Sequence, residues 1–112
     1  MGLEAMFFGR HDGPEDNLRL QRREEEWIQF PSYEALGSDA KILMHKLKNS
    51  YVDPDDFSFD IMDNDPIFQN DKSMDTFNAK ERAEVFIPWL EDYSSCYATD
   101  QLFILFGMDF HY

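Results

Sequence analysis

The sequence predicts an α/β fold that is an incomplete piece of a larger parallel sheet. Two short apolar segments, Leu3–Gly9 and Leu102–Phe106, have the continuous hydrophobic character of strands that a parallel sheet buries on both faces. The residues between them carry helical patterns and a long polar loop. Two such strands without neighbours would leave unpaired edges and exposed aromatic rings. We therefore expect the chain to be a fragment of a larger sheet domain.

The first strand is predicted over Leu3–Gly9, because a turn-forming glycine-proline pair follows this apolar run. A helix is predicted from Pro14 to Phe30. Asp12 is a candidate N-cap, proline and two acidic residues occupy the first turn, and Trp27 and Ile28 supply apolar positions near the end. The outer face of this helix is expected to be charged.

A second, shorter helix is predicted after Ser38-Asp39, which can cap it. Its apolar positions are Ile42, Leu43 and Leu47, which recur at helical spacing. Asn49-Ser50 would end it, and the apolar face would pack on another element.

The second half of the chain is predicted to be a loop, a helix and a strand. Residues 51–76 are rich in Asp, Asn, Pro and Ser, and the alternation in Phe57–Met62 predicts a brief strand within this loop. A helix is predicted from Asn78 to about Tyr97, in which Pro88 could introduce a kink. Leu102–Phe106 is predicted to be the last strand.

Composition and charge exclude several classes of function. The chain has 112 residues, of which 43% are apolar and 16% aromatic, so it should bury a core. Its formal net charge of -13 repels phosphate backbones and anionic headgroups, and we therefore expect no nucleic-acid or membrane partner. The longest apolar run, Leu102–Phe106, is far shorter than the roughly 20 residues that span a bilayer.

Two charged residues follow the predicted strands directly. Arg10 comes after the first strand and Asp109 after the last, with Gly9 directly before Arg10 and Gly107 two residues before Asp109. If the strands are parallel, both side chains lie at the edge where α/β proteins bind ligands, and the glycines would let backbone approach a ligand closely. On the pattern alone, a solvated strand-end charge is the favoured interpretation of Arg10, and a turn or capping residue that of Asp109.

Metal and nucleophile patterns are weak within the chain. The spacings of His11, His45 and His111 match no metal-binding pair, so we expect no zinc site here. The aspartates of residues 53–65 lack the glycine and closing glutamate of an EF-hand, which favours a solvated acidic loop. Cys96 has no basic residue nearby in the sequence and is expected to be a core residue rather than a nucleophile.

A series of short motifs runs along the whole chain in one order. They are Met1–Arg10, Glu24–Trp27, Pro31-Ser32, Leu36–Ser38, Asn49–Tyr51, Phe59-Asp60, Asn78–Arg82, Tyr97–Thr99 and Gly107–Tyr112. This series resembles the glycoside hydrolase family 38 α-mannosidases, above all the lysosomal type. The resemblance implies that residues 1–112 are a partial N-terminal catalytic domain, an incomplete piece of a larger parallel-sheet, barrel-like glycoside hydrolase domain.

The resemblance also implies roles for three residues. Asp109 matches the acid/base carboxylate of the family, Arg10 matches its active-site arginine, and Tyr51 matches a tyrosine that contacts substrate. A retaining glycosidase needs a second carboxylate as nucleophile, about 5 to 5.5 Å from the first. The family's nucleophile and its zinc ligands match no position in this chain, so zinc is expected only in the full-length enzyme and the chain alone should be inactive.

The same resemblance implies a substrate, a partner and a compartment. The substrates would be mannose-containing oligosaccharides such as N-glycans, whose terminal α-mannosidic bonds are hydrolysed with retention. The partner would be the rest of the α-mannosidase polypeptide, and the compartment the lysosome or another secretory compartment.

Several positions depart from the family pattern. Ser58 and Asp63 stand where the lysosomal type has two cysteines, so a family disulfide would be missing. Gly13, Ala98 and Asp100 also replace the usual residue types. The alternative interpretation is a small acidic interaction module without catalytic activity, whose aromatic loop over residues 51–68 docks on a partner protein.

Overall fold

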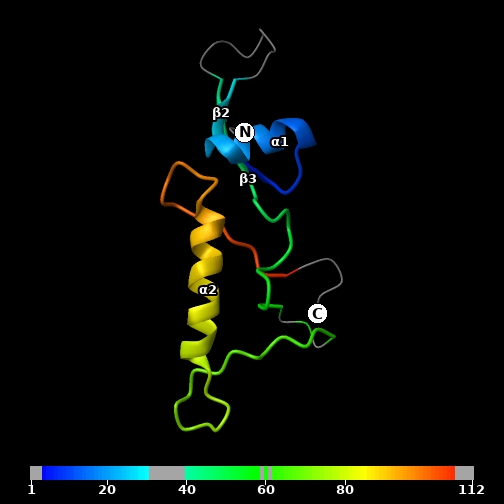
Figure 1. Cartoon of the computed structure of the whole chain (residues 1–112). Coiled ribbons are helices and arrows are strands. Elements are labelled where there is room, and N and C mark those ends of the chain that lie inside the picture. The colour runs from blue at the N-terminus through cyan, green and yellow to red at the C-terminus, as the bar shows by residue number, and fades with distance from the viewer. Residues whose placement is uncertain (1–3, 31–39, 59, 61, 108–112) are drawn as a thin grey trace.

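The computed structural model describes residues 4–30, 40–58, 60 and 62–107. They form strand β1 (Ala5–Phe8), helix α1 (Gly13–Arg22), strands β2 (Glu26–Gln29) and β3 (Ile42–Lys46), and helix α2 (Ala79–Ser94), as Figure 1 shows. The α/β class is confirmed, and so is the predicted first strand.

The three strands form one mixed sheet in the order β1-β3-β2. β1 runs parallel to β3, with Phe7 opposite His45 and Phe8 opposite Lys46. β2 runs antiparallel to β3, with Glu26 also opposite His45. Among the described residues, the expectation of a parallel sheet is therefore met only between β1 and β3, and the larger barrel-like domain stays a prediction.

The helix predicted over Pro14–Phe30 is wrong in its second half, because the chain turns at Arg23. This residue adopts the left-handed conformation (φ 60°) that commonly ends helices, and its backbone N–H bonds to the Leu20 carbonyl at 3.3 Å. The chain then enters β2, in which Trp27 and Ile28 lie on opposite faces of the sheet rather than on one helical stripe.

The second predicted helix is wrong, because Ile42–Lys46 forms the central strand of the sheet. A short apolar run fits a helix and a strand equally well on its spacing alone. Here both edges of β3 form backbone ladders, one with β1 and one with β2, so pairing with distant segments determines the strand.

The helix predicted from Asn78 is confirmed as α2, and Pro88 lies within it. The last predicted strand is wrong, because residues 102–106 form no strand. Leu102 and Ile104 instead pack against the core residues Tyr93, Cys96 and Tyr97 around the carboxyl end of α2. Tyr93 Oη donates a hydrogen bond to the Phe103 carbonyl at 3.0 Å. The apolar character of this segment therefore reflects packing on a helix.

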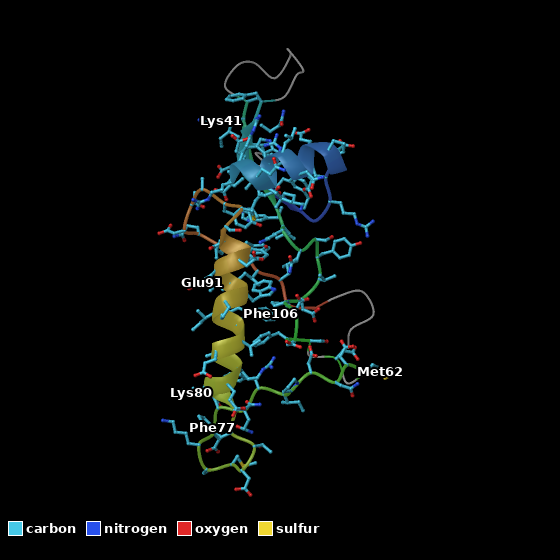
Figure 2. The ribbon with its side chains drawn as sticks, viewed as in Figure 1. Lys41, Met62, Phe77, Lys80, Glu91 and Phe106 are labelled. Atoms are coloured by element: carbon cyan, nitrogen blue, oxygen red, sulfur yellow. The ribbon has the colours of Figure 1, made fainter. Side chains whose placement is uncertain are left out.

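The loop between β3 and α2 is long, as predicted, but the strand fragment over Phe57–Met62 is wrong for its described residues. Ser58 and Asp60 lie in no strand. Met62 lies in a turn, and its backbone N–H donates a hydrogen bond to the Asp60 carboxylate. Met62 is 84% exposed and projects at the rim of this loop in Figure 2.

The molecule is extended for its length. Its radius of gyration is 18.1 Å, whereas a compact domain of this size would have about 13 Å. Large apolar side chains are exposed on both helices and on β1, among them Phe7 at 49% and Ile87 at 53%. No helix among the described residues is long and apolar enough to cross a membrane.

Candidate functional site

The carboxyl ends of β1 and β3 lie side by side and carry two of the three predicted site residues. Gly9 and Arg10 follow β1 directly, and a turn ending at Tyr51 follows β3. The Leu47 backbone N–H bonds to the Phe8 carbonyl at 2.9 Å, so the parallel pairing continues to the end of both strands. Both segments therefore leave the sheet at the edge where α/β proteins place ligand-binding groups.

Arg10 and Tyr51 contact each other there, although 41 positions separate them in the sequence. The Arg10 guanidinium donates a hydrogen bond to the Tyr51 hydroxyl, and its Cζ atom lies 5.1 Å from the centroid of the Tyr51 ring. Arg10 is exposed and Tyr51 half-buried, so the pair faces solvent on one side. A guanidinium with five N–H donors beside an aromatic face can donate hydrogen bonds to the oxygen atoms of a ligand.

The third predicted site residue, Asp109, lies outside the described residues. Gly107 is the last described residue before it, and its φ of 122° is one that side-chain-bearing residues rarely adopt. The expectation that Asp109 and Arg10 share one edge of the sheet therefore stays a prediction.

The buried side chain of His45 lies at the centre of the sheet, a position that the sequence patterns did not predict. His45 Nδ1 lies 2.8 Å from Glu26 Oε2, and its ring stacks on Tyr97 with 4.7 Å between centroids and 8° between planes. Phe7 packs on the same ring at 5.2 Å. The alternation of β3 would have placed His45 and Lys46 on opposite faces once Ile42–Lys46 had been assigned as a strand, but its neighbours Phe7 and Glu26 follow only from the register of the three strands.

The opposite face of the sheet contains a buried group of charges. Lys46 Nζ lies 2.9 Å from Asp16 Oδ1 and 3.9 Å from Glu25 Oε2, and Glu25 is fully buried. Burial raises the pKa of Glu25 to about 6, against the attraction of Lys46, which lowers it. The sequence shows only a run of three glutamates, which gives no sign that the middle one is buried.

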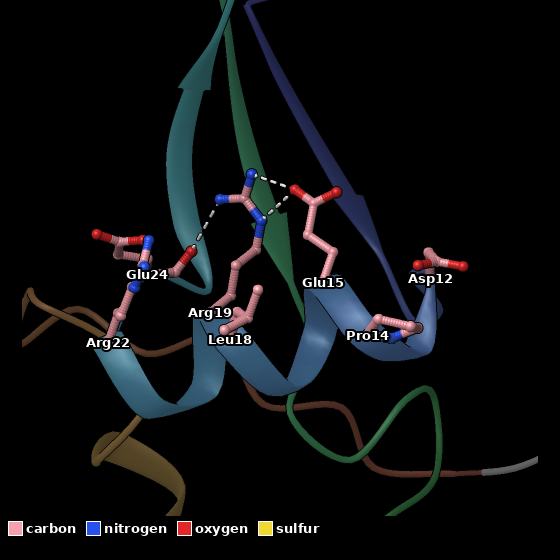
Figure 3. Close-up of a pocket in the computed structure, with 7 residues that line it drawn as sticks. All are labelled: Asp12, Pro14, Glu15, Leu18, Arg19, Arg22 and Glu24. Atoms are coloured by element: carbon pink, nitrogen blue, oxygen red, sulfur yellow. Dashed lines mark hydrogen bonds and ion pairs between the residues drawn. The ribbon is translucent and has the colours of Figure 1, made fainter.

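A shallow depression of about 470 Å³ lies along α1 (Figure 3) and is a weak candidate for binding. Its one central cation, Arg19, is already held by Glu15 Oε1 at 2.6 Å and by the Glu24 carbonyl at 3.3 Å. The depression also lies away from the ends of the parallel strands. Its central cation is therefore already paired within the chain.

The described residues do not fit a metal ion. No three of their His, Cys, Asp or Glu side chains form a group that could hold one. His11 packs against Trp27 on the face that α1 covers, whereas His45 lies on the other face, and His111 is outside the described residues. Cys96 is a buried core residue, as predicted, and burial raises the pKa of its thiol to about 11.

Comparison with known proteins gives matches along the whole chain. The lysosomal alpha-mannosidase of Dictyostelium discoideum is 30% identical to it over 112 residues, that of Cavia porcellus is 29% identical over 112 residues, and a probable alpha-mannosidase of Arabidopsis thaliana is 27% identical over 113 residues. Each match covers the whole of this chain but only 11% of the relative. No family model matches the chain. The resemblance seen in the motifs is thus confirmed: from end to end, this chain is similar to α-mannosidases of the lysosomal type.

Proposed function

We propose that the chain is a segment of the catalytic domain of a retaining α-mannosidase that hydrolyses terminal α-mannosidic bonds in oligosaccharides. The observation that carries the proposal is the end-to-end similarity to α-mannosidases at 27–30% identity. In this segment Arg10 and Tyr51 bind the sugar, and Asp109 is the acid/base carboxylate.

The contact between Arg10 and Tyr51 supports their shared role. Both residues stand at the carboxyl ends of neighbouring parallel strands, and the N–H donors of Arg10 can bond to the hydroxyl oxygens of a sugar. Asp109 would protonate the leaving oxygen and then accept a proton from water. The nucleophile would come from outside this chain, so the chain alone would lack half of the catalytic pair and be inactive.

The zinc ion expected of the full-length family finds no fitting group of ligands in the described residues. We therefore assign no chemical step of this segment to a metal. The full-length protein would supply any zinc site.

The partner of the segment would be the rest of the α-mannosidase polypeptide. The extended shape and the exposed apolar side chains of β1 and α2 suit a piece that packs on further structure. The names of the relatives point to the lysosome as the compartment.

The test is a chimaera in which this chain replaces the corresponding segment of a lysosomal α-mannosidase. The chimaera should hydrolyse oligomannosides. Asp109→Ala should lower their turnover by about 100- to 10,000-fold, the range of lost general acid catalysis. A dinitrophenyl mannoside, whose leaving group needs no proton, should be affected much less in the glycosylation step, and azide should partly rescue deglycosylation.

Two controls sharpen this test. Arg10→Ala should impair both substrates, because sugar binding is needed whatever group leaves. Asp75→Ala, which removes an exposed carboxylate in the loop before α2, should change neither. If Asp109→Ala lowered the turnover of both substrates equally and azide gave no rescue, Asp109 would have a structural role and not an acid/base role.

A second candidate, an acidic interaction module, has one observation in its favour. Met62 and Ile67 are 84% and 86% exposed within a loop rich in aspartate, as expected of a surface that docks on a basic partner. The genomic context distinguishes the two. Upstream coding sequence with a His-x-Asp motif and a later aspartate would favour the enzyme, and its absence would favour the module.

A further inference from the structure

Gly9 is placed where no side chain fits. A Cβ atom at this position would lie 2.7 Å from Cδ1 of Tyr51, 3.0 Å from Oγ of Ser50 and 3.1 Å from the carbonyl carbon of Ser50. Real Cβ atoms essentially never approach another heavy atom as closely as 2.7 Å. The Tyr51 ring therefore rests directly on the Gly9 backbone, one residue before Arg10.

The turn that carries Tyr51 contains a second unusual position. Ser50 has a φ of 59°, in the left-handed region that residues with side chains rarely adopt. Its backbone N–H bonds to the Leu47 carbonyl at 3.1 Å, which ties the turn to the end of β3. This reversal directs the next residue, Tyr51, back towards the end of β1.

We propose that Gly9 and Ser50 are positioning residues that hold Tyr51 against Arg10 at the end of the parallel strand pair. The inference rests on the proposed function, since that pair is the sugar-binding pair assigned above. Gly9 lets the Tyr51 ring contact the backbone at the end of β1, and the left-handed conformation of Ser50 sets the direction in which Tyr51 leaves the turn. A methyl group at position 9 would displace the ring and carry its hydroxyl away from the guanidinium.

The direct test uses the 112-residue chain and requires no sugar. NMR signals of the Arg10 side-chain N–H and of a selectively labelled Tyr51 ring are compared between the wild type and Gly9→Ala. The guanidinium lies near the Tyr51 ring, so its protons should have ring-shifted resonances, and Gly9→Ala should return them to ordinary values. The matched control is Gly13→Ala, because a Cβ there meets nothing within 4 Å and the signals should stay unchanged.

Ser50 variants test the second half of the proposal. Ser50→Gly keeps the left-handed conformation accessible and should preserve the ring-shifted signals. Ser50→Val disfavours that conformation and should abolish them. Wild-type-like Arg10 and Tyr51 signals in Gly9→Ala, or equal behaviour of the glycine and valine variants, would overturn the proposal.

A kinetic test in the chimaera separates positioning from general damage to the fold. Gly9→Ala should raise KM for a mannoside by about 10- to 100-fold, the cost of a misplaced contact, with much less effect on kcat. Gly13→Ala should alter neither constant. A loss confined to kcat would overturn the positioning role.

The NMR and kinetic measurements can reject the positioning role and the proposed function independently. If the unmodified chimaera is inactive, the proposed function fails, but the NMR comparison still decides whether Gly9 and Ser50 set the Arg10–Tyr51 contact. If the chimaera is active and Gly9→Ala leaves both the signals and KM unchanged, the positioning role fails while the proposed function stands.

Discussion

The two faces of the sheet are built from neighbouring residues but differ in chemistry. On one face, Phe7 and His45 lie in a row with Glu26, and Tyr97 stacks on the histidine. On the other face, α1 covers Lys46 and Glu25. Lys46 forms ion pairs there with Glu25 and with Asp16 of α1. We call these the aromatic face and the charged face after the surroundings of His45 and Lys46, although Phe8, His11 and Trp27 also contact one another on the charged face.

The difference comes from the alternation of side chains along a strand. His45 and Lys46 are consecutive in β3, and Glu25 and Glu26 are consecutive at the start of β2, yet each pair is divided between the faces. The rings around His45 contribute through the area and geometry of their contacts, whereas a buried charge such as Lys46 is stable only beside an opposite charge. The faces should therefore respond to different substitutions.

The largest effect is expected on the aromatic face from Tyr97→Ala. Tyr97 is fully buried, stacks on His45, and donates its hydroxyl to the Lys46 carbonyl at 2.8 Å. Removing a buried aromatic ring of this kind lowers the free energy of unfolding by about 3 to 5 kcal/mol. Urea denaturation followed by circular dichroism measures it.

Tyr97→Phe is the control for that prediction. It keeps the ring and loses the hydroxyl, which donates to the Lys46 carbonyl, accepts from the Lys48 backbone N–H and lies 3.3 Å from the Tyr93 hydroxyl. The loss should be about 1 to 2 kcal/mol. If alanine and phenylalanine cost the same, the ring stack contributes little and the aromatic face is held by its hydrogen bonds.

A somewhat smaller effect is expected on the charged face from Lys46→Met. Methionine fills a similar volume but leaves Glu25 without its cation, and removing one partner of a buried pair costs about 3 kcal/mol, the lower end of the usual range, because Lys46 lies 3.9 Å from Glu25. Lys48→Met is the control, because Lys48 pairs at 2.6 Å with Asp92, which is 76% exposed, and such pairs contribute about 1 kcal/mol at most.

A double variant distinguishes pairing from packing at Lys46. Glu25→Gln combined with Lys46→Met removes the uncompensated carboxylate as well, so it should recover part of the lost stability. Strict additivity of the two substitutions would mean that the two charges do not interact across β2 and β3.

Local patterns predicted the parts of the fold that depend on neighbours in sequence. The first strand and α2 were found because an apolar run and a helical face are visible within one segment. β2 and β3 were missed because their strands form by pairing with each other across a gap in the sequence. The buried Glu25 was missed for the same reason: its burial is set by α1 and Lys46, not by its neighbours.

The candidate site divides in the same way. Arg10 was noticed at a strand end, but Tyr51 was found only through the resemblance to a family, since one tyrosine in a polar loop has no distinguishing pattern. Their contact depends on the parallel pairing of β1 with β3. The requirement for Gly9 appears only when the ring that rests on it has been placed.

The smallest expected effect is the pH dependence of the charged face, and it arises from Glu25. Burial raises its pKa to about 6 from an ordinary value of 4.5, while Lys46 and Arg19 lower it and Asp16 raises it further. The folded chain therefore binds the Glu25 proton more tightly than the unfolded chain. Its contribution to stability is greatest below pH 4.5, falls as the pH rises towards 6, and levels off above that, a total of about 2 kcal/mol at most.

Glu25→Gln should remove this slope. Glutamine cannot ionise, so the variant should match the wild type near pH 4.5 and exceed it in unfolding free energy near pH 7.5. Urea midpoints at the two pH values measure the difference, and Glu24→Gln, which removes the exposed carboxylate next to it, should keep the wild-type slope. If the Glu25-dependent stability of the wild type instead rose between pH 4.5 and 7.5, the pKa of Glu25 would be lowered on folding. The attraction of Lys46 would then outweigh the cost of burial, and the ion pair would stabilise the charged face.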